Sequence, residues 1–339
     1  MPSRHELVAR PRPARCRAPS RARSRGINHL LRLKTVYLGT SEFAATVLRT
    51  LAAGPHRPAL VVTPPDRPRG RGRRPGAPPT AIAAAELGIE VERSADVNEE
   101  ATRGRIDAAR PDVIVVCAFG QIVREPLLSA GEILNVHPSL LPRWRGAAPI
   151  ERAIMAGDEA TGVCIIRLTA GLDSGPVALR REIPIGPGDD YGSLAATLAA
   201  AGGELLGAAL DRRAAGPLDY EEQAGEGVTY AEKIERDERR IDPTASAESA
   251  GRTIRALTPH IGAFAELGDG ARLGLRDPIV LVAGPPPGRF ESAAGELLLG
   301  CGSGALRIGS VQPAGGRWMD AADYLRGHGP PPPVAPPPR

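Results

Sequence analysis

The sequence predicts a doubly wound parallel α/β domain followed by a smaller β-barrel domain. Two observations lead to this fold class. Apolar runs alternate with helical segments from residue 34 to about residue 215, as in domains whose parallel sheet is covered by helices on both faces. After residue 235, short strand-like segments follow one another with turn residues between them, as in small barrels. A chain of 339 residues is long enough for two such domains.

The first domain is expected to begin with a strand and a capped helix. Residues 35–38 are expected to form a short strand, and Ser41 can cap a helix that runs to about residue 53. Residues 112–118 form a near-continuous apolar run, which is typical of a parallel strand buried on both faces. The other expected elements are strands at residues 59–62 and 133–137 and helices at residues 81–87 and 190–214.

The second domain is expected to contain one helix and several short strands. The helix lies at residues 247–257, and the strands lie at residues 263–267, 271–275, 279–282, 295–299 and 305–311. The expected division of the chain is a basic disordered tail at 1–33, a first domain at 34–215, a linker at 216–234, a second domain at 235–328 and an unstructured Pro-rich tail at 329–339.

Charge is unevenly distributed along the chain. The formal net charge is +4, but residues 1–34 carry nine Arg and Lys34 against the single acid Glu6, so the remainder is net acidic. Binding to nucleic acid would therefore depend on a local basic patch. For the tail itself we favour a flexible basic arm or an upstream start assigned in error over an organelle transit peptide.

Cysteine usage and hydropathy exclude several protein classes. Cys16, Cys117, Cys164 and Cys301 are widely scattered and lack metal-ligand spacing, so neither a metal site nor a disulfide framework is expected. No apolar run reaches the roughly 18 residues that a membrane-spanning helix needs. These features predict a soluble protein of a reducing compartment.

Three polar side chains carry the chemical signal. Asn135 and His137 end an apolar strand and point to the same side of it, because side chains alternate along a strand. Asp173 lies further along, in a glycine-bounded turn. Taken singly, these residues could be a satisfied core amide, a structural histidine and a turn aspartate. Together they can stabilise an oxyanion and move protons around it.

Two motifs carry a family resemblance. The chain resembles the folate-dependent formyltransferases in Asn135-Val136-His137-Pro138-Ser139-Leu140-Leu141-Pro142 and in Asp173. It is similar to the branch that formylates methionyl-tRNA in Arg143-Trp144-Arg145-Gly146-Ala147-Ala148-Pro149-Ile150. The resemblance extends from about residue 34 to about residue 325.

The resemblance implies a Rossmann-like formyltransferase domain followed by an OB-like barrel that contacts tRNA. It implies a cytoplasmic enzyme of translation initiation, monomeric and without a metal, that transfers the formyl group of 10-formyltetrahydrofolate to the α-amine of charged initiator tRNA. Asn135 and His137 would donate hydrogen bonds to the formyl oxygen. Asp173 would orient His137 and favour its charged form, or would relay the proton.

The resemblance also implies two binding surfaces. The folate would lie against Ser139, Leu140, Leu141 and Pro142, with Phe119, Gly120, Gln121, Ala170, Gly171 and Leu172 on the pterin side. The acceptor arm of tRNA would be held by a Pro/Gly-rich loop that contains Arg67, Arg69, Arg71, Arg73 and Arg74. Guanidinium groups suit phosphates and unpaired bases, although a charge run alone could equally be solvated chain.

Three alternatives remain open. A formyltransferase acting on a nucleotide-linked amino sugar, on glycinamide ribonucleotide or on another amine would not need the basic loop or the second domain. A non-catalytic RNA-binding protein would not need the Asn/His/Asp set. A Rossmann dehydrogenase would need the glycine fingerprint that Gly39-Thr40-Ser41 lacks. One departure from the branch is Pro259-His260-Ile261-Gly262, where relatives often carry a Pro-Trp-Pro-like segment, so the docking of the second domain is open.

Overall fold

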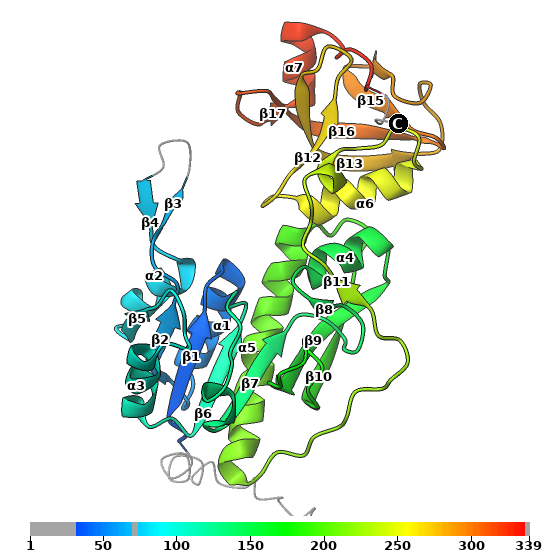
Figure 1. The fold of residues 1–339 in the computed structure, drawn as a ribbon. Coiled ribbons are helices and arrows are strands. Elements are labelled where there is room, and N and C mark those ends of the chain that lie inside the picture. Colours follow the sequence, from blue (N-terminus) through cyan, green and yellow to red (C-terminus); the bar gives the residue numbers. More distant parts are fainter. Residues whose placement is uncertain (1–31, 70–73, 336–339) are drawn as a thin grey trace, which may run out of the picture.

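The computed structural model describes residues 32–69 and 74–335, which form an α/β domain and a C-terminal β domain (Figure 1). A seven-stranded sheet is the centre of the first domain. Its strands are β1 (Thr35–Gly39), β2 (Pro58–Thr63), β5 (Glu90–Arg93), β6 (Val113–Cys117), β7 (Glu132–His137), β9 (Ala160–Arg167) and β10 (Val177–Pro184). The helices of this domain are α1 (Glu42–Ala52), α2 (Pro79–Glu86), α3 (Glu100–Ala109), the 3-10 helix η1 (Leu127–Ser129), α4 (Pro149–Ala156) and α5 (Tyr191–Ala215).

The strand order confirms the Rossmann-like fold class. Across the sheet the order is β10-β9-β7-β6-β1-β2-β5, and the strands from β7 to β5 run parallel. β9 pairs antiparallel with β7, and β10 pairs antiparallel with β9; antiparallel pairing of this kind is common at one edge of a large α/β sheet. β7, which carries Asn135 and His137, therefore has a parallel neighbour on one side and an antiparallel neighbour on the other.

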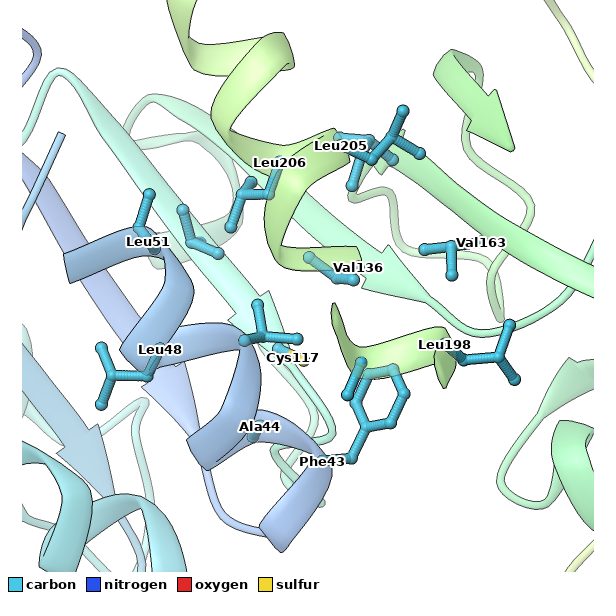
Figure 2. Packing of buried hydrophobic residues seen from close by; sticks show 14 of the residues in the cluster. Phe43, Ala44, Leu48, Leu51, Cys117, Val136, Val163, Leu198, Leu205 and Leu206 are labelled. Atoms are coloured by element: carbon cyan, nitrogen blue, oxygen red, sulfur yellow. The ribbon is translucent and has the colours of Figure 1, made fainter. Parts of the chain in front are cut away.

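The parallel strands are buried on both faces. Tyr37 of β1 belongs to a core that α1 and α5 cover, and Figure 2 shows Leu48 of α1 and Leu206 of α5 in that core. Val36 and Leu38 of the same strand point to the opposite face, where α3 packs. Because neither face of these strands meets water, their sequence is almost uniformly apolar rather than alternating.

Three of the four cysteines lie in the described residues, and all three are buried free thiols, as expected for Cys117 and Cys164. Burial raises the pKa of the Cys117 thiol to about 12, so this side chain acts as a small hydrophobic group of the core and not as a nucleophile. Cys16 lies outside the described residues.

Helix boundaries follow local hydrogen bonds. The Ser41 hydroxyl accepts a hydrogen bond from the Ala44 amide and caps α1, as the sequence predicted. Asp190 and Ser193 form a reciprocal capping box at the start of α5. Among the described helices, α5 has the length and apolar composition of a membrane span, but 61% of that stretch is buried inside the protein, where it packs on α1 and the sheet.

The C-terminal domain is a six-stranded antiparallel sheet with two helices. Its elements are η2 (Asp237–Arg239), α6 (Ala247–Leu257), β12 (Ala263–Glu266), β13 (Arg272–Leu281), β14 (Phe290–Ala293), β15 (Glu296–Gly300), β16 (Ala305–Pro313), β17 (Met319–Asp320) and α7 (Ala321–His328). Leu273, Leu275 and Leu306 lie at its core with Ile254 of α6. The expected small β domain is thus confirmed, and α6 has the predicted boundaries.

Two expectations for this domain are wrong. The strands expected at residues 271–275 and 279–282 are one strand, β13, which pairs with β16 in continuous register. Asp277 and Pro278 lie between the two expected strands. Asp277 adopts a positive φ of 54°, yet the hydrogen-bonded pairing of β13 with β16 continues past it.

The second error concerns the Pro-rich segment after residue 328, which was expected to be unstructured. Val334 is buried and lies between the two edges of the sheet. Its amide donates to the Gly288 carbonyl next to β14, while the Ala335 amide donates to the Glu266 carbonyl at the end of β12. Residues 333–335 therefore bridge the edges that the sheet would otherwise leave open, a role that proline-rich composition does not reveal.

Residues 259–262, the segment that differs from the Pro-Trp-Pro-like segment of relatives, form a contact between the domains. His260 Nε2 lies 2.9 Å from Glu151 Oε1 of α4, and the His260 ring stacks on Tyr191 of α5 with centroids 3.5 Å apart. The α4 and α6 helices also pack against each other. A histidine thus docks the second domain through a hydrogen bond and a ring stack.

Candidate active site

Asn135 and His137 lie together at the carboxyl end of β7, where ligands bind in open α/β sheets. Both side chains are almost completely buried, with relative exposures of 8% and 4%. Buried amide and imidazole groups need hydrogen-bond partners, and Asp173 provides contacts to both. Asp173 follows β9 in the chain and adopts a left-handed backbone with φ of 44°.

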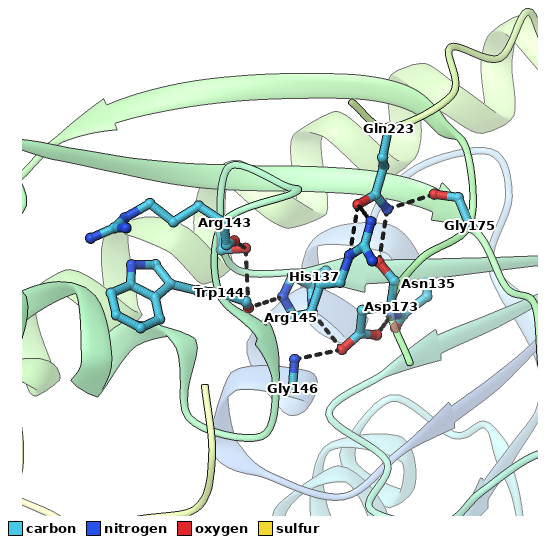
Figure 3. Close-up of polar contacts among 10 residues, drawn as sticks. Asn135, His137, Arg143, Trp144, Arg145, Gly146, Asp173, Gly175 and Gln223 are labelled. Atoms are coloured by element: carbon cyan, nitrogen blue, oxygen red, sulfur yellow. Dashed lines mark hydrogen bonds and ion pairs between the residues drawn. The ribbon is translucent and has the colours of Figure 1, made fainter. Parts of the chain in front are cut away.

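The structure brings the three predicted catalytic residues into contact (Figure 3). Asn135 Nδ2 donates to Asp173 Oδ1 at 3.3 Å, and His137 Nδ1 lies 3.5 Å from Asp173 Oδ2. The Gly146 amide donates to Asp173 Oδ2 at 2.9 Å. The carboxylate therefore has one short hydrogen bond, to the backbone, and two longer contacts to the side chains.

The partners of His137 determine where its protons are. Nε2 lies 2.9 Å from the carbonyl oxygen of Trp144, which can only accept, so Nε2 carries a hydrogen. Nδ1 is therefore the ring nitrogen that faces the Asp173 carboxylate.

The carbonyl that holds His137 belongs to a strained turn. Trp144 has a φ of 63°, an uncommon conformation for a bulky residue. Its amide donates to Thr229 Oγ1 at 2.9 Å, and the hydroxyl of buried Ser139 donates to the adjacent Arg143 carbonyl at 2.7 Å. Ser139, expected to line the folate slot, thus uses its side chain to fix this turn.

Asp158 fixes the side chains of the same turn. Its carboxylate accepts two hydrogen bonds from Arg143, at 2.6 and 2.8 Å, and one from Trp144 Nε1 at 2.8 Å. Burial alone would raise the pKa of Asp158, but these hydrogen bonds together outweigh burial and leave the pKa lowered. The turn is thus held by an ionised carboxylate.

Sequence reasoning missed Gln223, which lies in the expected linker. Its Nε2 donates to the carbonyls of Asp173 and Gly175, both at 2.7 Å, and its Oε1 accepts from Arg145 at 2.7 Å (Figure 3). One amide thus connects the aspartate turn to the Trp144 turn. No signal in the polar, aperiodic linker marks this residue.

The linker makes further backbone contacts with the site. Strand β11 (Tyr230–Ala231) pairs in parallel with β8 (Arg145–Gly146). A Cβ atom at residue 146 would stand 2.8 Å from the Ala231 carbonyl, and its φ is 120°, so only glycine fits there. The segment expected to be a linker therefore forms one wall of the site.

Some of the residues expected to bind folate are buried in the core, and others are exposed. Leu141 packs with Cys164, Ile166 and Val177. Phe119 is 2% exposed and belongs to the core, and Gln121 hydrogen-bonds Ser94 and Val97 through its side chain. The remaining exposed or partly exposed candidates are Leu140, Pro142, Gly120, Ala170, Gly171 and Leu172. Among the apolar candidates, Leu172, at 60% exposure, is the most open to a ligand.

The basic segment contains a short hairpin of β3 (Arg67–Arg69) and β4 (Arg74–Gly76). It follows β2 and projects from the carboxyl edge of the sheet, the edge at which β7 also ends (Figure 1). Arg67 is exposed; Arg71 and Arg73 lie outside the described residues.

Comparison with known proteins identifies the family. The family model for formyl transferase matches residues 33–210, and the model for the formyl transferase C-terminal domain matches residues 233–329. The chain belongs to the formyltransferase family. A methionyl-tRNA formyltransferase from Halorhodospira halophila is 43% identical over 305 residues, which cover 87% of this chain and 96% of that protein. One from Methylococcus capsulatus is 43% identical over 300 residues, covering 87% and 97%.

Solved structures show the same fold at lower identity. HypX from Aquifex aeolicus in complex with tetrahydrofolic acid has a TM-score of 0.61 and 18% identity, covering 86% of this formyltransferase and 47% of HypX. An N-formyltransferase from Helicobacter canadensis has a TM-score of 0.61 and 15% identity, covering 81% and 98%.

The contacts of Gln223 give a testable role in positioning Asp173. We expect Gln223→Glu to keep the pairing with Arg145 but to leave the Asp173 and Gly175 carbonyls without donors. Loosening of this turn should lower kcat for formyl transfer about tenfold, which corresponds to roughly 1.4 kcal/mol, with little change in the KM for folate. Glu222→Gln, at an exposed neighbouring residue, is the control. Equal kcat in the two variants would contradict the role.

Proposed function

We propose that this formyltransferase transfers the formyl group of 10-formyltetrahydrofolate to the α-amine of methionyl-initiator tRNA, giving formylmethionyl-tRNA for translation initiation. The observation that carries the proposal is 43% identity to proteins named methionyl-tRNA formyltransferase across nearly their whole length. The matched region includes both domains. Formyltransferases acting on small amines are not favoured, since their solved relatives resemble this chain only in fold.

The reaction requires charge stabilisation and two proton movements. The amine nitrogen of the charged tRNA attacks the formyl carbon, and negative charge develops on the formyl oxygen. The bond from that carbon to N10 of the folate then breaks, N10 gains a proton, and the former amine loses one. Hydrogen-bond donors aimed at the oxygen and a nearby base are therefore the groups that accelerate transfer.

The site supplies donors of this kind. Asn135 Nδ2 has a second hydrogen that no acceptor among the described residues engages. Because the Trp144 carbonyl holds His137 Nε2, the donor of His137 that can turn to the formyl oxygen is Nδ1. Its contact with Asp173 is 3.5 Å long, and such contacts often tighten or exchange when substrate binds. Asp173, between both donors, is placed to accept the amine proton.

The surroundings of the trio fit a folate substrate. The ring system of a folate needs apolar surface beside the reacting carbon, and the loops after neighbouring strands expose Ile122 (70%) and Leu172 (60%). The glycines at positions 120 and 171 leave the backbone of these loops accessible. We place the pterin along these two loops and the reacting carbon at Asn135.

We assign the two domains different parts of this task. Residues 34–215 would bind folate and catalyse transfer, residues 216–234 would connect the domains, and residues 235–328 would contact tRNA. The enzyme would act as a cytoplasmic monomer.

The basic hairpin gives a prediction about the tRNA substrate. Replacing Arg67, Arg69, Arg71, Arg73 and Arg74 together by Gln should raise the KM for methionyl-tRNA and leave the KM for folate unchanged. Each phosphate contact that is lost should flatten the dependence of log affinity on log salt by roughly 0.7 to 0.9. Arg49→Gln with Arg105→Gln, on exposed helix surfaces, serves as a charge control. An equal rise in the KM for both substrates would indicate a folding defect. An unchanged KM for methionyl-tRNA would mean that the hairpin is a solvated loop without a part in binding.

A transfer assay tests the proposal as a whole. Purified protein with 10-formyltetrahydrofolate labelled in the formyl group is incubated with methionyl-initiator tRNA, with uncharged tRNA or with a UDP-linked amino sugar. Label should appear only on methionyl-tRNA. Transfer to the amino sugar alone would replace the proposed substrate, and tRNA binding without turnover on any amine would indicate a binding protein.

A further inference from the structure

The outward face of the C-terminal sheet carries a pocket of about 380 Å³. It is lined by β12, β13 and β16, by the turn between α6 and β12, and by Trp318. This volume falls within the range of small-ligand pockets, roughly 300 to 1,000 Å³. None of the residues assigned above to catalysis or folate binding lines it.

One half of the pocket is built on β13. Arg272, Gly274 and Arg276 point outward, because the alternate residues Leu273 and Leu275 are buried in the core. A Cβ atom at residue 274 would stand 3.1 Å from the Trp318 ring, so glycine leaves room for the indole beside the strand. The Arg276 guanidinium lies 3.8 Å from the centre of that ring. The pocket therefore contains a stacked arginine–tryptophan pair.

The other half repeats this chemistry around Phe264 of β12. The guanidinium of Arg272 lies 4.5 Å from the centre of the Phe264 ring, and that of Arg239 lies 6.0 Å from it. Arg239 is fixed by hydrogen bonds to the carbonyls of Ile261 and Gly262. Arg276 is likewise fixed by the Pro259 carbonyl at 2.8 Å.

The arginines of the pocket have no directly paired acid. Within residues 32–69 and 74–335, no carboxylate forms an ion pair with Arg239, Arg272 or Arg276, and Asp277 and Asp190 act on Arg276 only by longer-range attraction. Three guanidinium groups beside two aromatic rings match a ligand that has both negative charge and a flat ring.

We propose that this pocket binds one unpaired nucleotide of the tRNA substrate. The base stacks against the Trp318–Arg276 and Phe264–Arg272 pairs, and the exposed guanidinium of Arg272 contacts the phosphate. Stacking on aromatic and guanidinium planes is how proteins recognise bases that are free of a helix, and Arg suits the phosphate. The inference rests on the proposed tRNA substrate and adds a defined contact remote from the reacting amine.

The test measures equilibrium binding of uncharged initiator tRNA to the full-length protein, so that catalysis plays no part. Arg272→Gln and Trp318→Leu should each raise Kd roughly 5- to 100-fold, the range expected for loss of one stacked base or phosphate contact. Arg272→Lys should preserve the salt dependence, and Arg272→Gln should flatten it by roughly 0.7 to 0.9. Arg289→Gln, an exposed arginine beside β14 with no part in the pocket, is the charge control.

The outcomes separate this inference from the proposed function. If the wild-type protein formylates methionyl-tRNA but both pocket variants bind tRNA as the wild type does, the pocket assignment is wrong and the function stands. If the wild-type protein neither binds nor formylates tRNA, both fail. If a free mononucleotide binds the wild type as tightly as tRNA does, the pocket is a small-molecule site.

Should Trp318→Leu unfold the domain, Trp318→Phe, which keeps a ring, must lose less affinity than Arg272→Gln for the proposal to hold.

Discussion

Replacing Asn135 or His137 by Ala is expected to lower kcat for formyl transfer about 10²- to 10³-fold. Each change removes one of the two donors that we assign to the formyl oxygen, and losing a single oxyanion donor has an effect of this size. The KM for either substrate should change little, because the lost interaction is strongest in the transition state. Steady-state kinetics with both substrates varied gives the two constants.

His137→Ala also leaves the Trp144 carbonyl with only the longer hydrogen bond from the Ser139 hydroxyl, at 3.4 Å, which should destabilise the fold by about 1 kcal/mol. Thermal unfolding therefore accompanies the kinetics. His328→Ala is a matched control, since His328 is exposed on α7, where its ring stacks on Tyr324. Turnover within threefold of the wild type by a folded Asn135 or His137 variant would remove that residue from the chemistry.

Replacing Asp173 by Asn should lower kcat about 10²- to 10⁴-fold, the range typical of a lost general base. The amide has nearly the shape of the carboxylate, and its oxygen can still accept from the Gly146 amide, so the turn should be retained. Its nitrogen cannot accept a proton and would face Asn135 or His137 as a second donor. His137 Nδ1 would also lose the negatively charged neighbour that now lies 3.5 Å away.

Unfolding and the two kinetic constants distinguish this role from a structural one. A group needed only for proton transfer can be lost without loosening the turn, so Asp173→Asn should keep the Tm of the wild type and the KM for both substrates while kcat falls. Asp323→Asn, an exposed carboxylate of α7, is the control. A fall in kcat that is matched by a lower Tm and a higher KM for both substrates would make Asp173 a turn residue only.

Strands with strong apolar patterns could be predicted from the sequence. β1, β6 and β7 are buried on both faces, so their composition alone marks them as central parallel strands. The start of α1 was predicted from its cap, Ser41, and the bounds expected for α6 are also those observed, with Ser246 as its cap in the structure. Elements whose side chains alternate or face water gave weaker patterns, and for this reason β5, α3 and β10 were not predicted.

Long-range pairing was decided only in the folded chain. The antiparallel direction of β9 beside β7 depends on backbone hydrogen bonds between strands, which leave no trace in a single strand's composition. The same holds for β13, which continues through Asp277-Pro278 because β16 pairs with it on both sides of that point. Val334 is ordered because both edges of the barrel offer carbonyl acceptors to residues 334 and 335.

For the active site, the sequence by itself determined Asn135, His137 and Asp173, whose proximity the structure confirms while their roles remain predictions. Motif residues can be recognised because their chemical types recur at fixed spacing along the chain. The tertiary structure alone decided that Ser139 holds a turn, that the Trp144 carbonyl holds His137, and that Gln223 braces Asp173. These contacts join segments up to 50 residues apart through backbone carbonyls. Every residue type carries a carbonyl, so no pattern of side chains along the sequence can identify which of them will meet.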